Sequence, residues 1–145
     1  MVNLCDLNHW HLLLFGVPLL LATYWDIRWH IIPNWLCATV FCVGFVAFQP
    51  SHLLGIFIAL PLLIGALVER NSTHSIGGGD IKFTAACGFV LGVQTGMVGL
   101  MLGLCLFVVY YAIKGVALPQ KKGQPMPMAP SLSAGFTASF IIAQF

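Results

Sequence analysis

The segment GGGDIKFTAACGFVLG, residues 77–92, places three glycines and an aspartate before an apolar run, in a chain with only four acidic residues among 145. About 14 apolar residues follow Asp80, which as a helix rise about 21 Å against a hydrocarbon core of about 30 Å. If the far end of this helix reaches the opposite interface, Asp80 lies below the near membrane surface. Non-helical backbone at such a depth must be shielded by protein or line a water-filled cavity. Glycines allow such a loop to pack tightly.

The chain as a whole is too apolar to fold as a water-soluble globule. Of its residues 59% are hydrophobic and only 7% are charged, and the mean hydropathy is +0.95. This composition leaves too few polar side chains to cover a surface in water and is typical of integral membrane proteins. No polar stretch is long enough for a separate soluble domain, so residues 1–145 are predicted to form a single membrane domain. The net charge of +2 does not indicate a nucleic-acid partner.

Apolar runs divide the chain into candidate membrane-spanning helices. Pro, Gly or charged residues separate each run from the next. The runs cover residues 10–25, 35–49, 53–68, 81–94, 96–113 and 129–144. They predict an all-α fold, a polytopic bundle of about six transmembrane helices. On the fifth run, Gly96, Gly99 and Gly103 have a spacing that predicts the close approach of another helix.

The basic residues indicate how this bundle is oriented. All six lie in or beside alternate connections: Arg28, Arg70, Lys82, Lys114, Lys121 and Lys122. By the positive-inside rule these connections face the cytoplasm, so both termini are predicted to lie outside. Asp26 and Asp80 then fall at the cytoplasmic ends of the first and fourth spans. The sequence thus predicts a multi-pass protein of the cell membrane with both aspartates on the cytoplasmic side.

Each aspartate has an ordinary explanation when it is taken alone. Asp80 suits a helix N-cap, and Asp26 suits an interfacial charge paired with Arg28. Two carboxyl groups in one cavity have a further property, because they cannot both ionise at low cost and therefore share a proton. Such a pair can activate water with one member and protonate a departing amine with the other. The sequence therefore supports the hypothesis of a catalytic pair.

Other membrane chemistries leave less trace in the sequence. It contains neither the H-E-x-x-H motif of zinc proteases nor the G-x-S-x-G motif of serine hydrolases. The five histidines are scattered, and the five cysteines include no C-x-x-C pair, so we expect neither a metal nor another cofactor. Two alternatives stay open. One is an ion- or proton-coupled transporter or channel that uses the two aspartates, and the other is an assembly subunit whose aspartates pair with a partner's basic residues.

Three stretches of the chain resemble the type IV prepilin peptidases. DIRWHIIPNWL, residues 26–36, is similar to the family's D-x-x-x-x-x-I-P-N segment, and residues 77–92 are similar to its G-x-G-D-x-K segment. PMPMAPSLSAGF, residues 125–136, is similar to the late P-x-x-P stretch that leads into the last span. The three matches occur in the right order in a polytopic chain, and their combination is specific although G-x-G-D alone is a weak motif.

The resemblance implies an intramembrane aspartyl endopeptidase. Family members remove a short basic leader from prepilins or pseudopilins at the cytoplasmic membrane face, ahead of an apolar helical segment. Such a substrate and the membrane lipid are therefore the expected partners. Carried over by position, Asp26 and Asp80 are the catalytic pair. The matching motif residues around them are Gly77 and Gly79, which would shape the loop that presents Asp80, together with Lys82, Pro33 and Asn34.

The chain also departs from the longer family members. Those carry an additional cytoplasmic domain with paired C-x-x-C motifs and methylate the new N-terminus of the substrate. This sequence has neither the domain nor the motifs, so we do not expect methylation. It resembles the short, peptidase-only members associated with tight-adherence (Flp-type) pili. Archaeal preflagellin peptidases share the catalytic motif, so the resemblance leaves the type of substrate and the oligomeric state open.

Overall fold

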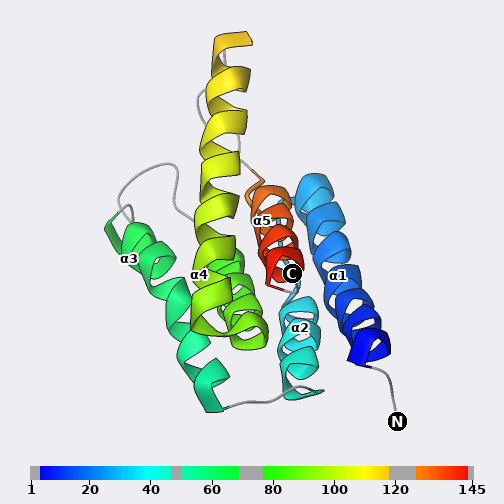
Figure 1. Cartoon of the computed structure of the whole chain (residues 1–145). Helices are drawn as coiled ribbons and strands as arrows, with labels where there is room; N and C mark the ends of the chain where they lie inside the picture. The colour runs from blue at the N-terminus through cyan, green and yellow to red at the C-terminus, as the bar shows by residue number, and fades with distance from the viewer. Residues whose placement is uncertain (1–3, 47–49, 69–76, 118–126, 144–145) are drawn as a thin grey trace.

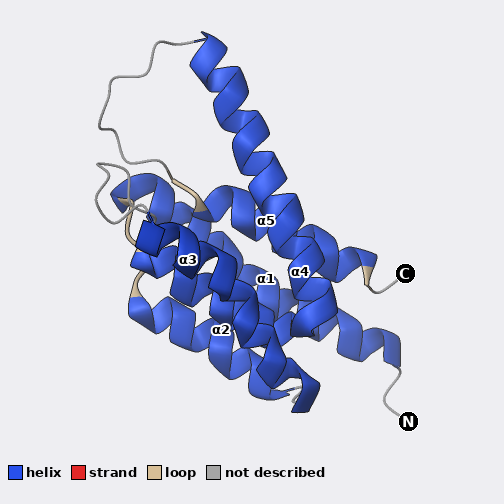
Figure 2. Ribbon diagram, turned by 90° about the vertical axis from the view of Figure 1, so that its left-hand side faces the viewer, coloured by secondary structure: helices blue, strands red, loops and turns tan. Residues whose placement is uncertain are grey.

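The described part of the chain is helical throughout (Figure 1, Figure 2). The computed structural model describes residues 4–46, 50–68, 77–117 and 127–143. Its elements are α1 (Leu4–Trp29), α2 (Asn34–Val46), the 3₁₀ helix η1 (Pro50–Ala59), α3 (Leu60–Val68), α4 (Gly78–Ala117) and α5 (Ala129–Ile142). Within these ranges no strand occurs, and the prediction of an all-α fold is confirmed.

The element α4 consists of two helices joined at Gly92. This glycine has φ 76° and ψ 177°, a conformation that is essentially restricted to glycine. In one straight helix Gly88 and Gly96 would lie about 12 Å apart. A Cβ built on Gly96 nevertheless comes within 3.4 Å of the Gly88 Cα. The chain therefore folds back on itself, and residues 78–91 (the first arm) lie beside residues 93–117 (the second arm).

With this reversal the described chain contains six apolar helical segments, one for each predicted run. The two arms of α4 account for the fourth and fifth runs, and η1 together with α3 accounts for the third. Counted as one continuous helix across Gly92, the segment Gly78–Lys114 is the one described helix that is long and apolar enough, by length and composition, to cross a membrane. Shorter apolar helices are Asn34–Val46, His52–Val68 and Ala129–Ile142.

Gly92→Ala is expected to destabilise the protein. Alanine is strained at φ 76°, and its Cβ would lie 3.2 Å from Cδ2 of His52. We expect the free energy of unfolding to fall by about 1–3 kcal/mol. A lower midpoint of thermal unfolding in detergent micelles would show this. Gly16→Ala is the matched control, because a Cβ there meets nothing within 4 Å. Equal midpoints for the two variants would contradict the strain argument.

Glycines allow the helices to pack at short range. Gly55 of η1 and Gly88 of the first arm face each other so closely that a side chain on either would collide with the other's carbonyl group. Gly96 lies against Ile58 of η1 and against the first arm, and Gly99 and Gly103 lie against α5. The close approach predicted for these three glycines is therefore confirmed.

A single apolar core joins the helices. Its fully or nearly fully buried side chains include Phe15, Leu19, Leu36, Val40, Phe83, Leu100, Leu132 and Phe136. The last helix, α5, packs against both α1 and α4. Ser133 of α5 donates its hydroxyl to the carbonyl oxygen of Leu19 in α1 at 3.3 Å. This arrangement sets the N-terminus of α5 beside the C-terminal end of α1 (Figure 1).

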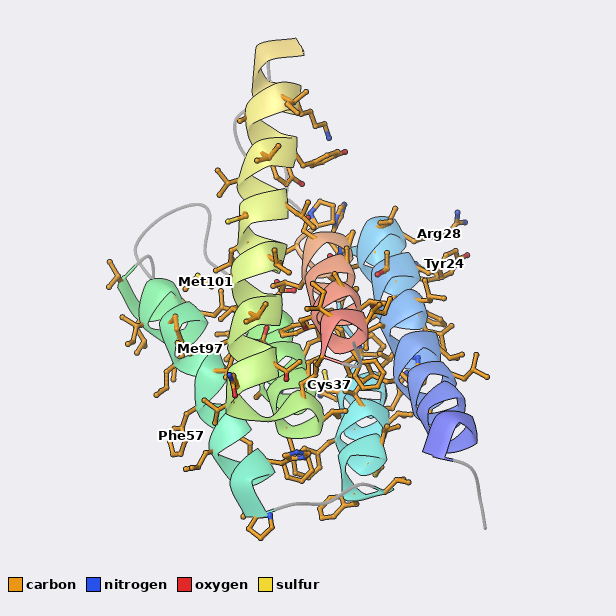
Figure 3. All side chains as sticks on the ribbon, viewed as in Figure 1. Tyr24, Arg28, Cys37, Phe57, Met97 and Met101 are labelled. Atoms are coloured by element: carbon orange, nitrogen blue, oxygen red, sulfur yellow. The ribbon has the colours of Figure 1, made fainter. Side chains whose placement is uncertain are left out.

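The outer surface of the bundle is also apolar. Phe57, Met97 and Met101 point away from η1 and α4, and each is more than half exposed (Figure 3). Leu20 of α1, Val68 of α3 and Ile113 of α4 are exposed in the same way. A surface of this kind is unfavourable in water and suits contact with lipid.

Candidate active site

Asp26 lies in the last turn of α1, where the chain turns toward α2. The helix ends at Trp29, and His30 adopts a left-handed conformation with φ 53°. The His30 N–H donates to the carbonyl oxygen of Asp26 at 2.9 Å, which closes the end of the helix. The chain then passes through Pro33 into α2, which begins at Asn34, one residue before the predicted apolar run 35–49. The Asp26 side chain is only 5% exposed.

The N-terminus of α5 is directed at the Asp26 carboxylate. The backbone N–H of Ala129 donates to Oδ2 of Asp26 at 2.9 Å, and the bond is buried. Ala129 and Pro130 form the first turn of α5, where proline is favoured and where unpaired N–H groups attract negative charge. The P-x-x-P stretch therefore leads into a helix that holds the first aspartate. Sequence analysis did not predict this contact.

Asp80 lies in the first turn of α4 and directly follows the three glycines in the sequence. It is 9% exposed, and its backbone N–H donates to the carbonyl oxygen of Gly77 at 3.0 Å. A Cβ on Gly77 would lie 3.2 Å from Oδ2 of Asp80, and one on Gly79 would lie 3.3 Å from the Cβ of Ile32. A Cβ on Gly78 would meet nothing within 4 Å. The two glycines of the G-x-G-D pattern thus occupy the crowded positions.

The fold brings the two aspartates to the same buried end of the bundle. They are close enough for the charge of Asp26 to act on Asp80. Their hydrogen bonding differs, because Asp26 accepts the N–H of Ala129 whereas Oδ1 of Asp80 is buried without a partner among the described residues. Buried polar atoms are normally paired, so this oxygen is available to a reactant or to water.

Lys82 connects the two motif segments. Its Nζ donates to Oδ1 of Asn34 at 3.2 Å, which links the first arm of α4 to the start of α2. Together with the contact between Gly79 and Ile32, this bond fixes the start of α4 against the connection from α1 to α2. Of the residues singled out in the two segments, Lys82 and Asn34 are therefore hydrogen-bonded to each other.

Aromatic and basic side chains surround the end of α1. The ring of Trp25 lies 5.2 Å from that of Trp29 and 5.9 Å from that of Trp35, measured between centroids. The guanidinium of Arg28 lies 5.8 Å from the centroid of Trp29. Tyr24 and Arg28 point away from the bundle (Figure 3). Such clusters are typical of a membrane interface.

Sequence analysis missed two polar side chains near the aspartates. Thr84 Oγ1 and the Tyr111 hydroxyl are buried atoms that have no hydrogen-bond partner in the described part of the chain. The charge of Asp26 also acts on Tyr111. Thr84 follows Asp80 by one helical turn, and this spacing was the signal available in the sequence. Over the described ranges, no three His, Cys, Asp or Glu side chains converge as a metal site would require.

Comparison with known proteins places the chain among leader peptidases. The sequence profile of the type IV leader peptidase family matches residues 13–113, which include both aspartates. The prepilin leader peptidase/N-methyltransferase of Bacillus subtilis (strain 168) is 30% identical over 132 residues, covering 85% of this chain and 52% of that protein. The chain therefore spans about half the length of this curated relative. No solved structure gives a significant match.

Proposed function

The chain belongs to the type IV leader peptidase family, and from this premise we propose that it is an intramembrane aspartyl endopeptidase. Its proposed substrates are prepilin- or pseudopilin-like proteins, in which a short basic leader precedes an apolar helix. The reaction is hydrolysis of the peptide bond that joins the two. The observation that carries the proposal is the pair of buried aspartates at one end of the bundle, near enough for an electrostatic interaction between them.

In this mechanism the two carboxyl groups share one proton. The ionised carboxylate takes a proton from water as the water oxygen bonds to the scissile carbonyl carbon, while the protonated carboxyl gives its proton to the carbonyl oxygen. The bond from carbon to nitrogen then breaks. The nitrogen leaves with the proton that came from water, and the second carboxyl recovers its proton from the intermediate. The products are the leader's new carboxyl terminus and the substrate's new amino terminus.

We place the site on the cytoplasmic side of the membrane, with six crossings and both termini outside. Arg28 and Lys82 lie close in sequence to the two aspartates, at the ends of α1 and α4. The far end of the second arm, which carries Lys114, extends past α1 and α5 on the side where α1 ends (Figure 1). The positive-inside rule supports a cytoplasmic location for this side.

The charge and surface of the site suit the proposed substrate. A basic leader is drawn to an end of the bundle that holds two carboxyl groups, one of which has an oxygen without a hydrogen-bond partner among the described residues. The apolar segment that follows the leader can remain in lipid and approach the bundle between its apolar helices. Only the scissile peptide bond of the substrate therefore needs to reach the two buried aspartates.

Co-expression with a prepilin-like substrate tests this function. We expect the chain to convert the substrate to a shorter form, detected by gel shift and by N-terminal sequencing of the product. A matched substrate whose basic leader residues are replaced by acidic ones should be cut more slowly, because the site then repels the leader. An uncut substrate in membranes that contain the chain at normal level would contradict the proposal.

A further inference from the structure

Thr84 is a buried residue whose hydroxyl forms no hydrogen bond within the described part of the chain. It lies in the first arm of α4, is 0% exposed, and its Oγ1 has no hydrogen-bond partner among the described residues. An unpaired buried hydroxyl is unfavourable and therefore uncommon in folded proteins. Oδ1 of Asp80, one turn earlier on the same helix, is buried and unpaired in the same way.

Three other helical threonines in this protein pair their hydroxyl groups with a backbone carbonyl oxygen of the same helix. Thr23, Thr39 and Thr137 each donate the hydroxyl to the carbonyl oxygen four residues earlier, at 3.0, 2.9 and 2.7 Å. That bond is the common way for a helical threonine to satisfy its hydroxyl. Thr84 has the carbonyl of Asp80 at the corresponding position and makes no bond to it. Its hydroxyl is therefore free to bond something other than its own helix.

The two unpaired oxygens belong to residues one turn apart on the same helix. Residues four apart lie on the same helix face, separated by about 6 Å of helical rise. A water molecule between two such side chains can form a hydrogen bond of about 2.8 Å with each oxygen. A buried water that joins such groups satisfies both at once.

We infer that Thr84 and Asp80 together hold the water molecule that attacks the scissile carbonyl group. The inference rests on the proposed function and extends it to a residue outside the matched motif positions. Thr84 acts as a positioning residue, since its hydroxyl orients the water and exchanges no proton in the net reaction. The water oxygen bonds to the carbonyl carbon, and its proton passes to the ionised carboxylate of the pair.

Thr84→Val and Thr84→Ser separate this role from simple packing. Valine keeps the shape of threonine and loses the hydroxyl, whereas serine keeps the hydroxyl and loses a methyl group. We expect Thr84→Val to lower kcat for leader cleavage about 10- to 100-fold, with KM changed by less than about twofold. Thr84→Ser should restore kcat to within about threefold of the parent value. Thr137→Val is the control, because among the described residues the Thr137 hydroxyl donates to the carbonyl oxygen of Ser133 in its own helix.

The test compares kcat of Thr84→Val with kcat of Thr84→Ser, and this comparison holds even if both variants are less stable than the parent. A packing role predicts that valine is at least as active as serine, and that result would overturn the inference. Parent-like kcat in Thr84→Val would overturn it as well. The proposed function fails separately, namely if the parent chain does not cut the substrate or if Asp80→Asn still cuts it.

Discussion

Asp26→Asn and Asp80→Asn are each expected to reduce leader cleavage about a thousandfold or more. Asparagine keeps the shape of aspartate, and at position 26 its oxygen can still accept the N–H of Ala129. It can neither take a proton from water nor give one to the substrate, so the loss of either carboxyl group disables the pair. The rate is measured with purified protein in detergent, from the appearance of the sequenced product over time.

Asp6→Asn is the matched control for this pair of variants. Position 6 lies in α1, 20 residues before Asp26, which is about 30 Å along the helix. We expect parent-like cleavage from Asp6→Asn, and expression levels and thermal midpoints close to the parent's for all three variants. Substantial cleavage by either Asp26→Asn or Asp80→Asn would exclude the proposed mechanism. The transporter and assembly-subunit hypotheses would then be the ones to test.

Gly79→Val is expected to lower cleavage about 100-fold, because a displacement of about 1 Å at a catalytic group can have an effect of this size. A Cβ at this position already lies 3.3 Å from the Cβ of Ile32 and 3.6 Å from its backbone nitrogen. The two further methyl groups of valine would push the start of α4 away from the connection between α1 and α2. Asp80, the next residue, would move with it. The same cleavage assay measures the loss.

Gly78→Val tests whether this effect is specific to the crowded position. Gly78 is exposed, and a Cβ there meets nothing within 4 Å. The two variants make the same chemical change at neighbouring residues, so any general effect of valine on the start of the helix appears in both. We expect Gly78→Val to stay within about threefold of the parent rate. Comparable losses in both variants would refute a specific contact between Gly79 and Ile32.

Much of the fold could be predicted from the sequence, because the helices correspond to uninterrupted apolar runs. The runs at 81–94 and 96–113 correspond to the two arms of α4, although the arms meet at Gly92 and not at residue 95, and α2 begins one residue before the predicted run 35–49. The reversal at Gly92 could not be located in advance. The chain has 15 glycines, and the sequence does not show which of them adopts a positive φ angle.

The site was predictable to the extent that it depends on ionisable residues and their order along the chain. Asp26 and Asp80 were expected on the same side of the membrane, and the structure places them at the same end of the bundle. The donor that holds Asp26 is a backbone N–H of Ala129, and a backbone group leaves no signature in residue identity. The unpaired hydroxyl of Thr84 depends on which way that side chain is rotated, which composition and spacing do not determine.

The single-residue turn at Gly92 also restricts how the chain can change in length. A connection of several residues can absorb an insertion, because the added segment extends into the surroundings. Here one added residue would become part of a helix and rotate everything that follows by about 100° relative to its neighbours. Gly96, Gly99 and Gly103 would then face away from the helices that they now touch. Insertions and deletions among relatives should therefore avoid this point, as should any engineered tag or epitope, although it lies at the opposite end of the first arm from Asp80.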